Sequence, residues 1–83
     1  MDERIVVIFN IVNRNLTIDI DIPLNITTKE LIIGLNKAYD LGINTSDINE
    51  CYLKTENPIA LLRGNKLLSD YGLRNGTIIN FSE

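Results

Sequence analysis

The chain has 83 residues, 45% of them hydrophobic, and a formal net charge of −3 at pH 7. This length supports one hydrophobic core, so we expect a single domain over residues 1–83. The apolar fraction excludes intrinsic disorder, and the lack of a basic block in the sequence argues against nucleic acid or an anionic membrane surface as a partner.

The residue types favour binding over catalysis. The sequence contains no His, which removes the commonest metal ligand and the side chain best suited to proton transfer near neutral pH. Cys51 is the single cysteine and has no visible activating base, so we interpret it as structural. Asp19 and Asp21 supply too few ligands for a metal, and there is no Gly-rich phosphate loop. We therefore expect no catalytic residue, no metal, no cofactor and no enzymatic activity.

The N-terminal segment indicates neither a signal peptide nor a membrane span. Met1-Asp2-Glu3-Arg4 is acidic and leads into only five apolar residues, Ile5 to Phe9. Together with the lone thiol, this predicts a protein of the cytoplasm that does not insert into a membrane, while attachment to a larger membrane complex stays open.

The first 22 residues predict a β-hairpin. Leu16 to Ile22 alternate strictly between apolar and polar, which is typical of a strand with one buried face. In Arg4 to Val12, apolar residues occupy both odd-numbered and even-numbered positions, as expected of a central strand covered on both faces. Asn13-Arg14-Asn15 between them favours a tight turn, because Asn tolerates a positive φ.

A helix is predicted over Thr28 to Leu41. Thr27-Thr28-Lys29-Glu30 forms a capping box at its start, and Gly42 is suited to the left-handed position after its end. Ile33 falls opposite the expected buried stripe. The stripe itself consists of Leu31, Ile32, Leu35, Ala38 and Tyr39.

The second half predicts short strands joined by turns. A connecting loop from Asn44 to Glu50, held by Ile48, precedes these elements. They are a strand Cys51 to Thr55, an edge strand Ile59 to Leu62, a capped single turn within Leu68 to Leu73 and, after the Asn75-Gly76 turn, a final strand Thr77 to Phe81. The expected order is β-β-α-β-β-β.

This pattern resembles the ubiquitin-like β-grasp fold, an α+β architecture in which one helix packs across a mixed sheet. The segment Leu68-Ser69-Asp70-Tyr71-Gly72-Leu73-Arg74-Asn75-Gly76 is similar to the one that precedes the last strand in the small YukD/EsaB family of firmicute type VII secretion loci. The resemblance implies a non-conjugated ubiquitin-like protein that binds protein partners as an accessory or regulatory component of the secretion machinery.

Two alternatives stay open beside this interpretation. Ubiquitin-type modifiers and sulfur carriers need a flexible Gly-Gly end that can enter an activating enzyme, whereas this sequence ends in Phe81-Ser82-Glu83. Conjugation is therefore disfavoured unless a native tail is lacking. The chain could also be the cytosolic ubiquitin-like domain of a larger membrane component.

The predicted sheet should have one open face that carries apolar residues. If Ile79 and Phe81 point toward the helix, the residues of opposite parity point outward. Thr17, Asp19 and Asp21 would then form a polar rim around an apolar centre. The alternative is that ordinary strand propensity leaves scattered apolar residues on the surface. The candidate partner-binding residues are Val6, Ile8, Tyr52 and Ile78.

Overall fold

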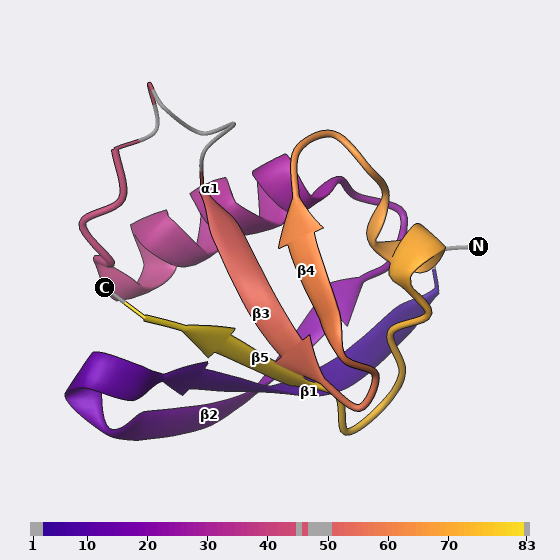
Figure 1. Cartoon of the computed structure of the whole chain (residues 1–83), viewed down its shortest axis with the longest axis horizontal. Coiled ribbons are helices and arrows are strands. Elements are labelled where there is room, and N and C mark those ends of the chain that lie inside the picture. The colour runs from indigo at the N-terminus through magenta and orange to yellow at the C-terminus, as the bar shows by residue number, and fades with distance from the viewer. Residues whose placement is uncertain (1–2, 45, 47–50, 83) are drawn as a thin grey trace.

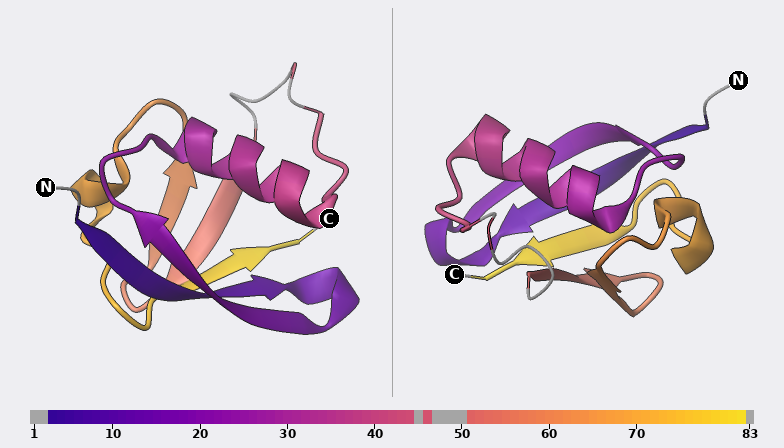
Figure 2. Two further views of the ribbon diagram at one scale, coloured as in Figure 1. Left: turned by 180° about the vertical axis from the view of Figure 1, so that it is seen from behind. Right: turned by 90° about the horizontal axis from the view of Figure 1, so that it is seen from above.

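The computed structural model describes residues 3–44, 46 and 51–82 (Figure 1). Five strands form one mixed sheet in the order β2-β1-β5-β3-β4, and helix α1 lies across one of its faces (Figure 2). Strand β1 pairs antiparallel with β2 and parallel with β5, while β3 pairs antiparallel with both β5 and β4. The predicted α+β class and element order are confirmed. The elements are β1 (Arg4–Ile11), β2 (Leu16–Pro23), α1 (Thr28–Tyr39), β3 (Tyr52–Glu56), β4 (Ala60–Arg63) and β5 (Ile78–Phe81), with short 3-10 helices at Val12–Arg14 and Leu68–Tyr71.

The predicted β1–β2 hairpin is present, and its tip is tied to the helix. Asn15 takes the left-handed conformation in the turn, with φ of 50°. The Arg14 guanidinium donates hydrogen bonds to the carbonyl oxygens of Tyr39 and Asp40, at 2.7 and 2.6 Å. These oxygens lie at the C-terminal end of α1, where helical carbonyls lack partners and attract a cation. One arginine thus joins the hairpin to the helix end.

The expectation that β1 is covered on both faces is wrong. Val7 and Phe9 are fully buried beneath the helix, but Val6 between them is 48% exposed. The strand is central in the order of the sheet, yet α1 covers only one side of it, as the view from above shows (Figure 2). In β2 the alternation is graded, with Ile22 buried and Leu16 exposed, because β2 is an edge strand.

The start of α1 agrees with the predicted capping box. The Thr27 hydroxyl accepts a hydrogen bond from the Glu30 amide at 3.1 Å, and the Glu30 carboxylate accepts one from the Thr27 amide at 3.3 Å. Leu31, Ile32 and Leu35 are buried as expected. Tyr39 is half-buried, and its ring centroid lies 5.7 Å from that of Phe9.

Two details of the helix prediction are wrong. The helix ends at Tyr39 rather than Leu41, because Asp40 already takes the left-handed conformation, with φ of 52°. This reversal turns Leu41 into the core, and its amide donates to the Asn36 carbonyl at 3.3 Å. Ala38 is exposed rather than part of the buried stripe, and its small side chain loses little by facing water.

Replacing Asp40 with Gly should raise the free energy of unfolding by about 0.5–1 kcal/mol. Gly adopts the left-handed conformation without a Cβ clash, and the change also removes an acidic side chain from the negative end of the helix dipole. Urea denaturation measures the effect. The control is Lys37→Gly within the helix, which should lower stability by about 1 kcal/mol. A loss of stability in Asp40→Gly would contradict this view of the helix end.

The later strands are present with small shifts of their ends. β3 and β4 each begin and end one residue later than predicted, and β4 is an edge strand as expected. β5 begins at Ile78 rather than Thr77. Most of the predicted 44–50 loop, including Ile48, lies outside the described residues. Within the described part of the chain, no helix is both long and apolar enough to span a membrane.

Candidate functional site

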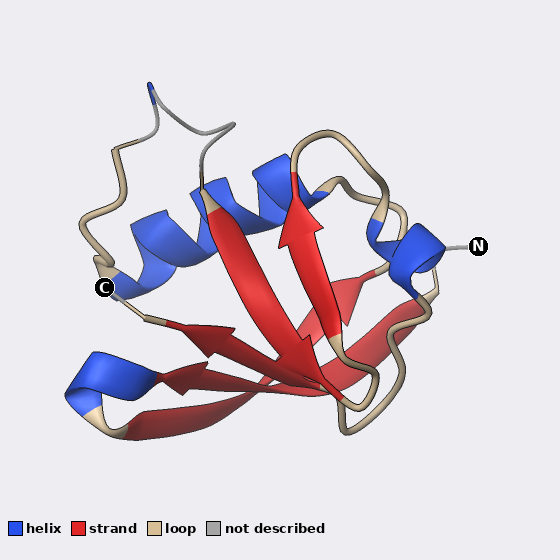
Figure 3. Ribbon diagram, viewed as in Figure 1, coloured by secondary structure: helices blue, strands red, loops and turns tan. Residues whose placement is uncertain are grey.

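One face of the sheet carries the helix, and the opposite face is open (Figure 3). Along β1 and β5 the odd-numbered residues are buried toward the helix, so the even-numbered residues point to the open face. Ile8 in β1 is aligned with Ile78 in β5, and Val6 lies two residues before Ile8 on the same face. Ile8 and Ile78 are half-buried, whereas Val6 is exposed. We call these three residues the apolar triplet.

Tyr52 lies apart from the apolar triplet. Ile78 pairs with Glu56 across the β3–β5 ladder, and Tyr52 is at the other end of β3. Four residues of a strand separate positions by about 13 Å. The Lys54 ammonium group sits 5.9 Å from the centre of the Tyr52 ring. The structure therefore brings three of the four predicted residues together and leaves Tyr52 in another place.

Two further exposed apolar residues, Leu61 and Ile59, were not among the predicted candidates. Leu61 pairs with Lys54 on the open face and is a diagonal neighbour of Tyr52, and Ile59, just before β4, is 90% exposed. The signal for Leu61 was its position beside Leu62, since adjacent residues of a strand point to opposite faces.

A hydrogen-bonded row of polar side chains borders the apolar triplet. The Asn10 amide group donates to the Asn80 side-chain oxygen at 2.9 Å, and the Asn80 amide group donates to the Glu56 carboxylate at 3.0 Å. The row runs across β1, β5 and β3 on the open face. It separates the apolar triplet from Tyr52 and Lys54.

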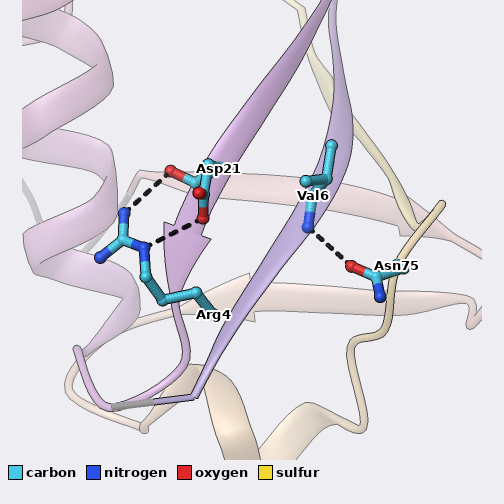
Figure 4. Close-up of polar contacts among 4 residues, drawn as sticks. All are labelled: Arg4, Val6, Asp21 and Asn75. Atoms are coloured by element: carbon cyan, nitrogen blue, oxygen red, sulfur yellow. Dashed lines mark hydrogen bonds and ion pairs between the residues drawn. The ribbon is translucent and has the colours of Figure 1, made fainter.

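Strand β2 borders the triplet on its other side. Asp19 is opposite Ile8 and Asp21 is opposite Val6 in the antiparallel ladder. The Arg4 guanidinium Nε donates to an Asp21 carboxylate oxygen at 3.0 Å (Figure 4). The predicted polar rim is thus present, with one of its two acidic residues held in an ion pair.

The turn before β5 fixes β5 against β1. The Val6 amide donates to the Asn75 side-chain oxygen at 2.8 Å (Figure 4). The Gly76 amide donates to the Val6 carbonyl at 2.9 Å. Gly76 has φ of 89°, a conformation suited to glycine. This turn therefore binds both the amide and the carbonyl group of Val6, which fastens the first residue of the apolar triplet to the segment before β5.

The sequence of this chain matches the model of a known protein family. A family model described as the WXG100 protein secretion system (Wss) protein YukD matches residues 6–80. The chain belongs to the YukD family. The matched residues include the whole apolar triplet and the turn that supports it. The family resemblance seen in the sequence is therefore confirmed, and no curated protein matches this YukD-family chain significantly.

Solved structures show the fold of the YukD-family chain. A ubiquitin-like domain from tubulin-binding cofactor B has 17% identity and a TM-score of 0.79, over 100% of this chain and 92% of that one. The C-terminal ubiquitin-like domain of mouse tubulin-specific chaperone e has 15% identity and a TM-score of 0.73, over 98% and 87%. A de novo design based on ubiquitin has 14% identity and a TM-score of 0.64, over 93% and 84%. The predicted ubiquitin-like β-grasp fold is confirmed.

Proposed function

We propose that this chain is a non-conjugated ubiquitin-like binding module that serves a type VII secretion system as an accessory or regulatory component. The family match over residues 6–80 supports the link to WXG100 protein secretion. The chain acts in the cytoplasm, consistent with a sequence whose one cysteine cannot form an internal disulfide, and binds protein components of the machinery without catalysing a reaction.

The observation that carries the proposal is the apolar triplet on the open sheet face. Val6, Ile8 and Ile78 are contiguous there and lie on two hydrogen-bonded strands. A partner that covers them removes apolar surface from water, and a backbone already hydrogen-bonded in a sheet has little conformational freedom to lose on binding. Apolar centres with polar rims are typical of protein interfaces.

Ile8→Asp should abolish export without unfolding the protein. A carboxylate at the centre of the triplet cannot be buried against an apolar partner without a counter-charge. In cells that lack the chain, wild type should restore release of WXG100 proteins into the medium, and Ile8→Asp should release at least about tenfold less. Immunoblotting of the medium measures export, and the melting temperature of each purified variant measures folding.

The matched control is Ile33→Asp, which places the same charge on the outer face of α1. This variant should support normal export. Val6→Asp repeats the test at the most exposed member of the triplet, in case Ile8→Asp unfolds. Normal export by a folded Ile8→Asp or Val6→Asp protein would overturn the proposed role of this face.

A further inference from the structure

A single row across four strands has apolar residues at its centre and a carboxylate at each end. The ladders align Asp19 of β2 with Ile8 of β1, Ile8 with Ile78 of β5, and Ile78 with Glu56 of β3. The alternating burial along each strand shows that all four side chains point to the open face. The acidic groups therefore flank the apolar triplet on opposite sides.

Neither flanking carboxylate has a cation partner among the described residues. Asp21 is paired with Arg4, but Asp19 takes part in no such pair within the described chain. Glu56 accepts a hydrogen bond only from the neutral Asn80 amide group in the same part of the chain. Since the whole chain carries a net charge of −3, these groups add to a negative field that favours a basic partner.

The spacing of these groups suits an α-helix laid along β1. Three strand spacings separate β2 from β3, which places the two carboxylate positions about 14 Å apart. A helix with its side chains is about 10–12 Å wide, so it fits between them. Val6 and Ile8 are about 6.7 Å apart along the strand, close to the rise of about 6 Å between helix positions i and i+4.

We propose that the partner presents an amphipathic helix whose apolar stripe is flanked on both sides by Lys or Arg. This inference rests on the proposed function and adds the chemistry of the partner. The apolar stripe covers Val6, Ile8 and Ile78, while cations on its two flanks meet Asp19 on one side and Glu56 on the other. The open face thereby selects helices by charge as well as by hydrophobicity.

Two synthetic helical peptides provide the probe. Each has about 18 residues, or five turns, and the same leucine stripe, but one carries Lys and the other Glu at the flanking positions. In an NMR titration of the labelled full chain, the Lys peptide should shift the amide signals of β1 and β5 and bind at least about tenfold more tightly than the Glu peptide. Equal binding of the two peptides, or shifts confined to α1, would overturn the inference.

Charge-neutralising variants test the two carboxylates directly. The double variant Asp19→Asn with Glu56→Gln should weaken binding of the Lys peptide by about tenfold, because both attractions are lost. The matched control, Asp40→Asn with Asp70→Asn, changes the net charge equally at exposed positions away from the open face and should leave the affinity within about twofold. Equal losses in the two double variants would overturn the assignment to Asp19 and Glu56.

The export assay separates this inference from the proposed function. If Ile8→Asp abolishes export and the Asp19→Asn with Glu56→Gln variant exports normally, the binding role of the face stands and the basic helix is ruled out. If Ile8→Asp exports normally while folded, the proposed function itself fails. If both variants lose export and the control variant does not, both proposals are supported.

Discussion

Truncating Leu35 to Ala should lower the free energy of unfolding by about 2–5 kcal/mol. Leu35 lies in the middle of α1 with only 6% of its surface exposed, and it belongs to the core between helix and sheet. Removal of its side chain loses apolar burial and leaves a cavity that rigid strands cannot collapse to fill. A loss of this size is a large part of the free energy of unfolding of a small domain, so chemical denaturation should detect it readily.

Ile33→Ala is the control for Leu35→Ala. Ile33 is on the same helix, two residues earlier, and is 40% exposed on the outer face. Its truncation should cost less than about 1 kcal/mol. Equal losses from the two variants would contradict the orientation of α1 on the sheet.

Thr77→Val should destabilise the protein by about 1–3 kcal/mol. The Thr77 side chain is fully buried, and its hydroxyl donates to the Asn57 carbonyl at 2.9 Å and accepts from the Arg74 amide at 3.0 Å. Valine has nearly the same shape but leaves both backbone groups without this partner. Thermal and urea unfolding of the purified variants measure the difference.

The same substitution at Thr28 should have the opposite sign. Thr28 is also fully buried, but its hydroxyl has no hydrogen-bond partner in the described part of the chain. Thr28→Val therefore removes an unsatisfied polar atom and should raise the free energy of unfolding by about 1 kcal/mol. If both threonine variants changed stability in the same direction, the hydrogen bonding of these two hydroxyls would be wrongly described.

Local patterns in the sequence were enough to predict the order of elements. The capping box at Thr27, the alternation after Leu16 and the Asn75-Gly76 turn each depend on neighbours in the sequence, and each is present in the structure. Local pattern was not enough to predict the end of the helix, because both Asp40 and Gly42 can adopt the left-handed conformation and both do. Which of them ends the helix depends on the burial of Leu41 and on Arg14 from the hairpin.

The candidate site was predicted only in part, because it too depends on contacts between residues that are far apart in the sequence. Alternation along a strand assigns each residue to a face, so the outward direction of Val6, Ile8 and Ile78 follows from the sequence. It does not say which residues of distant strands share a row. That depends on the β3–β5 register, which places Glu56 rather than Tyr52 beside Ile78.

The position of β5 has a consequence for how the chain folds during its synthesis. β5 is the middle strand of the sheet but the last to leave the ribosome (Figure 1). Until β5 emerges, the β1–β2 and β3–β4 hairpins have no strand between them. Asn10 cannot form its hydrogen bond to Asn80 until that residue is synthesised, 70 residues later. At a synthesis rate of about 5–20 residues per second, the edge of β1 that pairs with β5 stays without its partner strand for several seconds, during which a chaperone could bind it.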